Sequence, residues 1–445
     1  MPPAKNKNEV GRAIVTHARS VTALMIAQSL GEKGIEIIGC DEAALTVLSF
    51  SRFVKWNETH RPFDPDNPGD YLEDFQQIIR KHKPDDNIPY ILIPSHIDIE
   101  IFAANRELFE NDITLACPDS QALSSVHPKD NLVRTARAHD VNIPRTWLPA
   151  GEKDAARLAE DMQFPVLVKP PDQVGGRGIA RAEDKAGLKK QFQYIQSLFP
   201  EKQLLVQQFA DGQEYCFCGL YNNGQPVACS VYRNLHKYPR DSGPGAVRES
   251  VSSKVFQKVA DPLFGELNWT GVVEVDFNWN EQADTPPEMI EVNPRFWSGL
   301  DHSIKAGPEF PWLLYQVFIH GHAEPETEEI IGKRTSLPAL STMSRLEKIV
   351  NDSLNFEEFS RKWPEISEHF RNAELKDGLS LFQDALSGTV SIDEAVATFR
   401  ELVSKKDEIS KITYAEDDPF IGLGVLFVFA FLIRHGELPP ELRRP

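Results

Sequence analysis

The clearest indication of the fold comes from residues Glu288-Met-Ile-Glu-Val-Asn-Pro-Arg-Phe-Trp-Ser-Gly-Leu300, preceded by the run Gly271-Val-Val-Glu-Val-Asp-Phe277. Both runs have the alternation that is typical of β-strands. Side chains two residues apart project from the same face of a strand. Each run therefore carries a pair of oxygen-bearing side chains on one face: Glu274 and Asp276, then Glu291 and Asn293. If the two strands pair, they present a single oxygen-rich patch.

This patch predicts a metal site, because carboxylate and amide oxygens on rigid strands suit hard cations such as Mg²⁺, which usually share their site with substrate phosphates. Mn²⁺ is the alternative ion. The candidate ligands are Asp276, Glu291 and Asn293, and the pattern alone leaves Glu274 open as the acid of the first strand. Arg295 adds a fixed positive charge just beyond Asn293. Taken in isolation, the same runs are two amphipathic strands whose acids face solvent.

A second motif lies upstream of these strands. Residues 164–169, Phe-Pro-Val-Leu-Val-Lys, read as a short apolar strand that ends in Lys169, and a lysine is costly to bury unless an anion lies beside it. Residues 173–178, Gln-Val-Gly-Gly-Arg-Gly, follow as a loop whose glycines allow backbone N–H groups to approach phosphate oxygens closely. A lysine, a glycine-rich loop and a later acidic patch together predict a nucleotide site.

With these motifs the sequence resembles the ATP-grasp superfamily, and within it the carboxylate-amine ligases that carry an Asn-Pro-Arg-Phe-Trp signature, which stands here at residues 293–297. The resemblance extends from about residue 10 to about residue 321. It implies an α/β protein, with a Rossmann-like pre-ATP-grasp domain at 10–126 followed by an α+β ATP-grasp domain at 127–325. Beyond them, amphipathic patterns predict a helical C-terminal region at 326–415, followed by an apolar C-terminal segment at 416–445.

The resemblance also assigns roles to residues. It favours Asp276 over Glu274 as the metal ligand, because Asp276 matches the family's acidic position before a phenylalanine. The family usually has glutamate at the position of Gln208, so the resemblance gives that side chain no definite role. Arg295 would stabilise the charge that develops during phosphoryl transfer. The residues that would bind ATP are Lys129, Lys169, Gly175, Gly176, Gly178, Gln207, Phe209 and Glu214.

Residues 232–248 form a loop that bears glycine, proline and the basic residues Arg233, Lys237, Arg240 and Arg248. Such a loop beside an acidic metal site would clamp a carboxylate or the transferring phosphoryl group. Arg248 is the candidate catalytic residue within it. The alternative is a solvated loop without a function.

The N-terminal part, residues 10–41, reads as a strand, a helix that Ser20 caps, and a second strand, which is the beginning of a doubly wound unit. Its first turn, Thr16-His-Ala-Arg-Ser20, lacks the pattern Gly-x-Gly-x-x-Gly. This argues against a dinucleotide-binding domain. Arg19 and Arg52 either contact substrate or cap helices, and the sequence leaves both roles open.

Composition limits the class of protein. At 445 residues the chain is long enough for two or three domains, each with its own core. A formal net charge of −18 without a long basic run predicts no nucleic-acid partner. The N-terminus lacks the apolar region of a signal peptide, so we expect a cytoplasmic protein with reduced cysteines. Its five cysteines have no metal-ligand spacing: Cys40, Cys117, Cys216, Cys218 and Cys229.

An apolar run, residues 420–433, contrasts with this acidic composition. As a helix it would span only about 21 Å, well short of the ~30 Å hydrocarbon core of a bilayer. The run is a buried core segment, a contact within a homo-oligomer, or a shallow anchor that attaches the protein peripherally to a membrane surface. We expect it to pack against protein, because anionic lipid headgroups would repel the acids at 416–418.

Together these features predict an enzyme. The chain would use ATP and Mg²⁺ to phosphorylate a small-molecule carboxylate, and a small-molecule amine would then attack the acyl phosphate to give an amide. One alternative is the related carbamoyl-phosphate or biotin-carboxylase reaction, in which bicarbonate is phosphorylated, although the sequence shows no biotin- or glutamine-handling element. Another is a non-catalytic nucleotide-binding sensor, against which the candidate metal ligands argue.

Overall fold

The structure is a computed structural model, and it describes residues 10–64, 67–85, 87–172, 178–210, 212–237, 245–325, 327, 329–336, 365, 369 and 410–411. The chain divides into two compact units. Among the described residues, the larger unit takes those within 10–233 and 250–332, and the smaller takes those within 234–249 and 333–412. The domain boundaries expected from the sequence, at 126 and 325, stay predictions.

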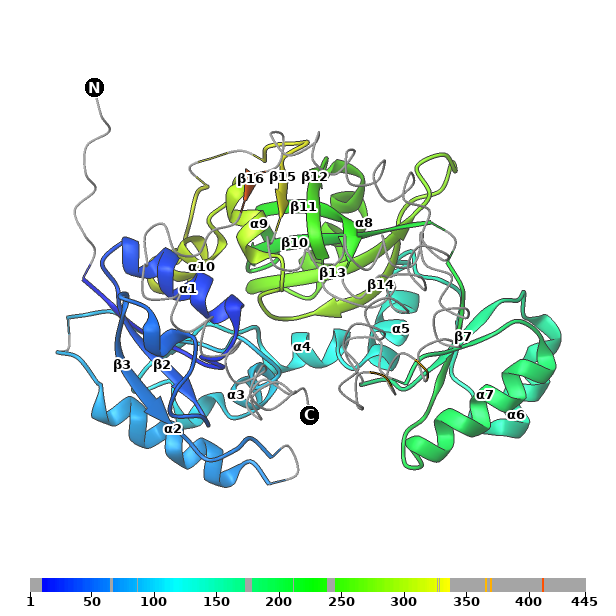
Figure 1. Cartoon of the computed structure of the whole chain (residues 1–445), viewed down its shortest axis with the longest axis horizontal. Coiled ribbons are helices and arrows are strands. Elements are labelled where there is room, and N and C mark those ends of the chain that lie inside the picture. The colour runs from blue at the N-terminus through cyan, green and yellow to red at the C-terminus, as the bar shows by residue number, and fades with distance from the viewer. Residues whose placement is uncertain are drawn as a thin grey trace. The chain divides into compact units, whose positions relative to one another are not determined.

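The larger unit begins with a parallel sheet in the strand order β3-β2-β1-β4-β5, of which β2 and β3 are labelled in Figure 1. β1, β2 and β4 are apolar and almost entirely buried, as expected of strands that are covered on both faces. The predicted start of a doubly wound unit is confirmed, and the edge strand β3 is an addition to it. The strands are β1 (Arg12–Val15), β2 (Glu36–Asp41), β3 (Val54–Thr59), β4 (Tyr90–Ile93) and β5 (Thr114–Leu115).

Helices cover both faces of this sheet. Alternate residues of β1 belong to different cores, because Val15 packs with helix α1 (Val21–Glu32) and Ile14 packs with helix α2 (Gly69–Lys81). Ser20 caps α1 as predicted, since its hydroxyl accepts a hydrogen bond from the backbone N–H of Ala23. The remaining helices of this part are α3 (Ile99–Ala104), η1 (Leu48–Phe50), η2 (Arg106–Leu108), α4 (Ser120–Val126) and α5 (Lys129–Ala138).

An antiparallel sheet carries the two acidic runs. Within the larger unit its order is β14-β13-β10-β11, with β10 (Gln213–Asn222), β11 (Gln225–Lys237), β13 (Gly271–Trp279) and β14 (Glu288–Asn293). One face packs against helix α8 (Lys254–Glu266) through an apolar core. Part of the other face packs against α1 and helix α10 (Phe310–His320), and α9 (Leu300–Lys305) precedes α10. The predicted pairing of the two acidic strands is confirmed.

A β-bulge sets which side chains of β14 face the core. Asp276 pairs with Glu291, whereas the next residue of β13, Phe277, pairs with Met289. Ile290 is therefore the extra residue of the bulge. Because of it, Met289 is fully buried against α8 while Glu291 lies on the opposite face, although the two are two residues apart.

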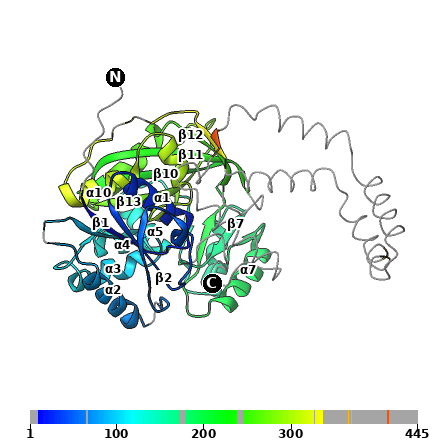
Figure 2. The same ribbon diagram turned by 60° about the vertical axis from the view of Figure 1, so that its left-hand side comes forward.

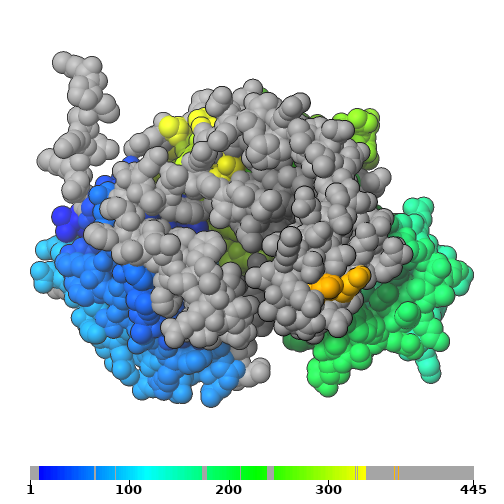
Figure 3. Space-filling view, viewed as in Figure 1, coloured from blue at the N-terminus to red at the C-terminus, as the bar shows by residue number. Residues whose placement is uncertain are grey.

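A smaller antiparallel sheet has the order β6-β9-β7-β8, with β6 (Thr146–Trp147), β7 (Val166–Lys169), β8 (Ala180–Ala182) and β9 (Leu205–Gln208). Helices α6 (Glu152–Leu158) and α7 (Lys185–Leu198) bury their apolar side chains against it, and η3 (Ala159–Asp161) follows α6. Figure 2 shows α7 beside β7. The green surface in Figure 3 belongs to this part of the chain. The strand predicted to end in Lys169 is β7.

The smaller unit contains most of β12 (Gly245–Val251), which pairs antiparallel with β15 (Arg334–Ser336). β15 pairs parallel with β16 (Ser410–Lys411). Arg334 forms an ion pair with Glu249 at 2.6 Å. Most of the predicted helical region at 326–415, and the whole of 416–445 with its apolar run at 420–433, lie outside the described residues. Among the residues that are described, no helix has both the length and the apolar character needed to cross a bilayer.

Candidate active site

One face of the antiparallel sheet gathers the acidic side chains. In the register of the strands, Asp276 lies opposite Glu291 on one side and opposite Cys216 on the other. Glu274 lies opposite Asn293 in the same way. Residues that are opposite one another in an antiparallel pair share a face, so three adjacent strands contribute to one surface. We call this surface the acidic face; its residues are Glu214, Cys216, Glu274, Asp276, Glu291 and Asn293.

Asp276 lies among other carboxylates on the acidic face. Burial and the neighbouring carboxylates of Glu274, Glu291 and Glu214 raise the pKa of Asp276 well above its usual range. Its hydrogen bond in the described part of the chain comes from the weak thiol donor of Cys216, with Sγ 3.6 Å from Oδ1. Carboxylates this close together favour a bound cation.

The donors of the acidic face fit a hard divalent cation. Asp276, Glu291 and Asn293 supply carboxylate and amide oxygens from rigid strands, and Asn293 is 7% exposed. Glu274 lies on the same face and is 8% exposed, so the geometry keeps it as an alternative to Asp276. These oxygen donors would hold Mg²⁺. Lys129 would be a neighbour of the ion, because the Lys129 Nζ lies 2.8 Å from Glu291 Oε1.

Lys129 and Lys169 bring two buried ammonium groups close to the acidic face. Lys169, at the end of β7, is 3% exposed, and burial, with a further contribution from the Lys129 charge, lowers its pKa to about 8. Its Nζ donates to Gln207 Oε1 at 2.7 Å. Gln207 Nε2 in turn donates to Thr146 Oγ1 at 2.9 Å, which fixes the amide so that its oxygen faces the lysine. Of the two adjacent glutamines, Gln207 is therefore the one that orients Lys169.

Replacing Gln207 with leucine is expected to destabilise the fold. A buried ammonium without its acceptor should lower the free energy of unfolding by about 1.5–3 kcal/mol. Because Lys169 is charged below pH 8 and increasingly neutral above it, the loss should be largest below pH 8 and should shrink as the pH rises further. Denaturant unfolding at several pH values measures the effect. In the control variant Gln208→Leu, which loses only a half-buried 3.5 Å contact with Pro165, the change should stay within about 0.5 kcal/mol. An equal loss in both variants would contradict the assignment.

The other predicted ATP-binding residues are placed as follows. The guanidinium of Arg181 stacks on the Phe209 ring, 4.4 Å from its centroid, just beyond the end of β9. Glu214 is exposed on β10. Gly178 has φ +66°, and a Cβ there would lie 2.7 Å from Phe199, so the position requires glycine. Gly175 and Gly176 lie outside the described residues.

Arg295 extends the acidic face toward the parallel sheet. Its Nη2 lies 3.4 Å from Asn293 Oδ1, and its positive charge also acts on His96. His96 follows β4 and stacks on His17, which follows β1, with ring centroids 4.2 Å apart. Burial, the His17 ring and the Arg295 charge lower the pKa of His96 to about 3, so this ring is neutral near pH 7. Sequence reasoning missed the histidine pair; the only signal was that each residue follows an apolar strand.

The stacked histidines mark the point where the strand order of the parallel sheet reverses. From β1 the chain proceeds to β2 and β3 on one side and then crosses to β4 and β5 on the other. In open α/β sheets, ligands bind outside the carboxyl ends of the strands at such a point. The turn itself is braced by Arg19, which donates to Asp41 Oδ1 at 2.8 Å and lies 2.7 Å from Glu42 Oε1. These contacts of Arg19 leave both of its possible roles, substrate contact and helix capping, as predictions. Arg52 is exposed, with its guanidinium over the Phe53 ring.

Arg248 is placed in the smaller unit. It lies on β12 opposite Thr335 of β15 and is 2% exposed. Its candidate catalytic role stays a prediction. The expectation of a loop at 232–248 is wrong at both ends, because residues 232–237 belong to β11 and residues 245–248 belong to β12. Arg233 and Lys237 therefore lie on β11, and Arg240 lies outside the described residues.

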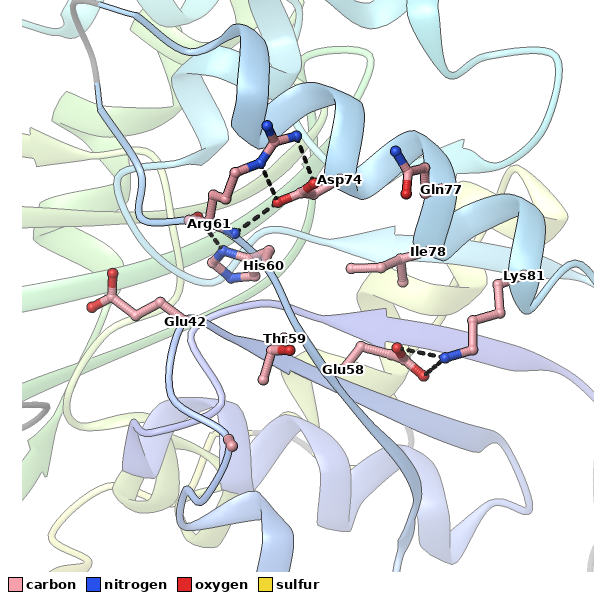
Figure 4. Close-up of a pocket in the computed structure, with 10 residues that line it drawn as sticks. Glu42, Glu58, Thr59, His60, Arg61, Asp74, Gln77, Ile78 and Lys81 are labelled. Carbon is pink, nitrogen blue, oxygen red and sulfur yellow. Dashed lines mark hydrogen bonds and ion pairs between the residues drawn. The ribbon is translucent and has the colours of Figure 1, made fainter.

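A polar hollow of about 650 Å³ lies elsewhere, over β3 and α2 (Figure 4). Its charged side chains bind one another. Arg61 pairs with Asp74 at 2.7 Å, and Lys81 donates to both oxygens of Glu58 at 2.9 Å. Since these charges are already compensated within the hollow, the acidic face is the better candidate for chemistry.

Comparisons with known proteins bear on the class of protein. Residues 129–215 match the profile of the family described as carbamoyl-phosphate synthase L chain, ATP binding domain, and residues 200–336 match that of ATP-grasp in the biosynthetic pathway with Ter operon. Over 297 residues the chain is 21% identical to the C-terminal section of the carbamoyl phosphate synthase large chain from Methanopyrus kandleri. That match covers 65% of this chain and 52% of the relative, so the chain spans about half the length of that relative.

Solved structures share the fold. The biotin carboxylase complex with β,γ-ATP from Campylobacter jejuni has a TM-score of 0.59 at 15% identity, covering 72% of this chain and 74% of its own. The biotin carboxylase domain dimer of 2-oxoglutarate carboxylase from Hydrogenobacter thermophilus, which holds MgADP, ADP and bicarbonate, has a TM-score of 0.58 at 14% identity and covers 73% of each chain. At these identities the solved structures show a shared fold, and the matched family profiles support the ATP-grasp superfamily for residues 129–336.

Proposed function

We propose that the chain is an ATP- and Mg²⁺-dependent ligase that phosphorylates a substrate carboxylate and joins the acyl group to an amine. The observation that carries this proposal is the position of Arg295 between Asn293, on the acidic face, and the His17–His96 pair of the parallel sheet. A phosphoryl donor held at the acidic face and an acceptor held beside the histidines would meet at Arg295.

The residues around the acidic face would have separate roles in binding the phosphates of ATP. Bound Mg²⁺ would neutralise charge on the phosphate oxygens. Lys169, oriented by Gln207, would donate to a phosphate oxygen, and Lys129 would exchange its contact with Glu291 for one with phosphate. Little covalent chemistry is required of the protein, because phosphoryl transfer depends mainly on positioning and on electrostatic stabilisation.

The acceptor would lie at the carboxyl ends of β1 and β4. The Arg295 guanidinium would bind a carboxylate there and stabilise the charge that develops during transfer. His96, neutral and partly buried, offers a hydrogen bond without adding charge. An oxygen of the carboxylate attacks the γ-phosphorus, ADP leaves, and the amine then displaces phosphate from the acyl phosphate.

Phosphorylation of bicarbonate is the second candidate function. The relative and the two solved structures described above support it, because they are a carbamoyl phosphate synthase and two biotin carboxylases. Arg295 would bind bicarbonate by the same geometry as a larger carboxylate. The two reactions therefore differ in the acceptor and not in the phosphate-handling residues.

An ADP-release screen with isotope tracing tests the proposal. The protein is assayed with MgATP and panels of amino acids, sugar acids and amines, with and without added bicarbonate. For the ligase we expect ADP only when a carboxylate and an amine are both present, and one oxygen of a heavy-oxygen-labelled carboxylate should appear in inorganic phosphate. ADP release that requires bicarbonate but no other carboxylate would instead establish the second candidate. ATP binding without turnover across all panels would contradict both and favour a nucleotide sensor.

A further inference from the structure

We propose that Cys216, Glu274 and Asp276 form a binding site for a thiophilic divalent cation such as Zn²⁺, which competes with Mg²⁺ for the acidic face. The Cys216 Sγ and one oxygen of each carboxylate all lie within 4.8 Å of one another. The proposal goes beyond the ligase reaction, because it concerns a second class of metal ion and requires no ATP turnover.

The strand register places the Cys216 thiol beside the two carboxylates. Cys216 lies directly opposite Asp276 on adjacent strands, and its Sγ lies 3.6 Å from Asp276 Oδ1. Its neighbours along the strand, Tyr215 and Phe217, point the other way and are buried in the core against α8. Cys216 itself is only partly buried, so an ion that enters the acidic face reaches its sulfur.

Asp276 supplies an independent reason for a cation. Among the described residues, its carboxylate has no ion pair, although Glu274 and Glu291 lie on the same face. Lys129 lies against Glu291 instead, and Lys169, whose charge interacts with Asp276, donates its hydrogen bond to Gln207. A carboxylate in this position is stabilised by a positive ion within bonding distance.

The donor set is suited to zinc. In four-coordinate sites Zn–S is about 2.3 Å and Zn–O about 2.0–2.2 Å, so ligand atoms lie roughly 3.3–3.8 Å apart. The observed Sγ–Oδ1 separation of 3.6 Å already falls in this range, and the other separations reach at most 4.8 Å. Sulfur, two carboxylates and a water would complete the coordination. Mg²⁺ takes oxygen ligands in preference to sulfur, so it would use Asp276 together with Glu291 and Asn293.

Binding exchanges a proton for the metal. The S–H bond of Cys216 breaks, the proton leaves to solvent, and the thiolate sulfur donates an electron pair to the ion, with no change of oxidation state. Both ions would use Asp276, so each should weaken the binding of the other. Zn²⁺ would therefore act as an inhibitor of Mg²⁺-dependent chemistry at this face.

Cadmium titration of the full, nucleotide-free chain tests the site. Cd²⁺ resembles Zn²⁺ as a thiolate-binding ion and gives an ultraviolet charge-transfer absorption when sulfur is a ligand. We expect a saturable absorption at one ion per chain, which Zn²⁺ abolishes and which Mg²⁺ shifts to higher Cd²⁺ concentration. In Cys216→Ser the absorption should disappear, and in Asp276→Asn the Cd²⁺ affinity should fall roughly 10–100-fold.

Cys229→Ser is the matched control. Cys229 is also a partly buried cysteine on a neighbouring strand of the same sheet, but it lies opposite Gly219 and its partly buried side chain packs into the core on the α8 side. This variant should bind Cd²⁺ as the unaltered chain does. An undiminished absorption in Cys216→Ser, or its loss in Cys229→Ser, would overturn the proposal. If Cys216→Ser does not fold, unchanged Cd²⁺ affinity in Asp276→Asn overturns it equally. None of these readouts involves ATP, so failure of the ligase assignment would leave the result unaffected.

Discussion

Replacing Asp276 with asparagine is expected to reduce MgATP-dependent turnover by ~10²–10³-fold, as the loss of one electrostatic stabiliser of a transition state typically does. The same substitution should make the metal-free protein more stable. Burial and the nearby carboxylate of Glu274 raise the pKa of Asp276 well above its usual range. Asparagine carries no charge, so the substitution removes the repulsion between this side chain and Glu274. Loss of activity together with a gain in stability is the signature of a residue kept for function.

Steady-state ADP release and thermal unfolding without added metal measure the two effects. A gain of about 1 kcal/mol would raise the midpoint by roughly 2–4 °C. Asp261→Asn is the control, because Asp261 is also an acid whose pKa burial raises, but it lies on α8 and accepts a hydrogen bond from Tyr221 at 2.8 Å. Its turnover should change by less than about threefold. If Glu274→Gln is inactive while Asp276→Asn is active, Glu274 is the ligand and the choice between the two acids is wrong.

Replacing Lys169 with alanine is expected to weaken ATP binding by about 10–100-fold, which corresponds to the loss of one hydrogen bond to a charged group. Lys169→Arg should lose less, because it keeps the charge and loses only the compact ammonium geometry. The control Lys185→Ala, on α7, removes an exposed ion pair with Glu160 and should leave the affinity within about threefold. Equal ATP affinity in the unaltered chain and in Lys169→Ala would exclude the phosphate role.

The pH dependence of ATP binding follows from the same lysine. In the free protein the pKa of Lys169 is about 8, and a bound phosphate would raise it by stabilising the charged form. ATP should therefore bind with full affinity below pH 8 and progressively more weakly as the pH rises above 8. Calorimetric titrations in buffers of different ionisation enthalpy should show proton uptake on binding near pH 8–9. In Lys169→Arg this proton uptake should be absent, since arginine stays charged throughout this range.

The parts of the site that the sequence predicted have long and regular local patterns. Glu274 and Asp276, and likewise Glu291 and Asn293, stand in runs long enough for alternation to identify a strand, and their pairing is confirmed. Lys169 was identifiable because a charged residue that ends an apolar run is unusual.

The parts that the sequence could not predict depend on contacts between distant segments. Nothing local indicates that β10 lies beside β13, so Cys216 could be read only as a cysteine in a strand. The ion pair between Lys129 and Glu291 joins a helix and a strand that are far apart in sequence. The orienting role of Gln207 was hidden because β9 has only four residues, too few for periodicity to separate it from Gln208.

Because of the bulge in β14, this strand can lose one residue at the bulge and keep its buried and acidic faces. Without Ile290, the remaining sequence Met289, Glu291, Val292 and Asn293 would alternate as a regular strand does, with Met289 and Val292 still buried and Glu291 and Asn293 still on the acidic face. Loss of Met289 would have the same result, with Ile290 taking its place opposite Phe277. A deletion at Val292, by contrast, would exchange the faces beyond it and direct Asn293 toward the core against α8. Engineered variants that lack one residue in this strand should therefore keep Glu291 and Asn293 in place when the missing residue is one of the two at the bulge, Met289 or Ile290.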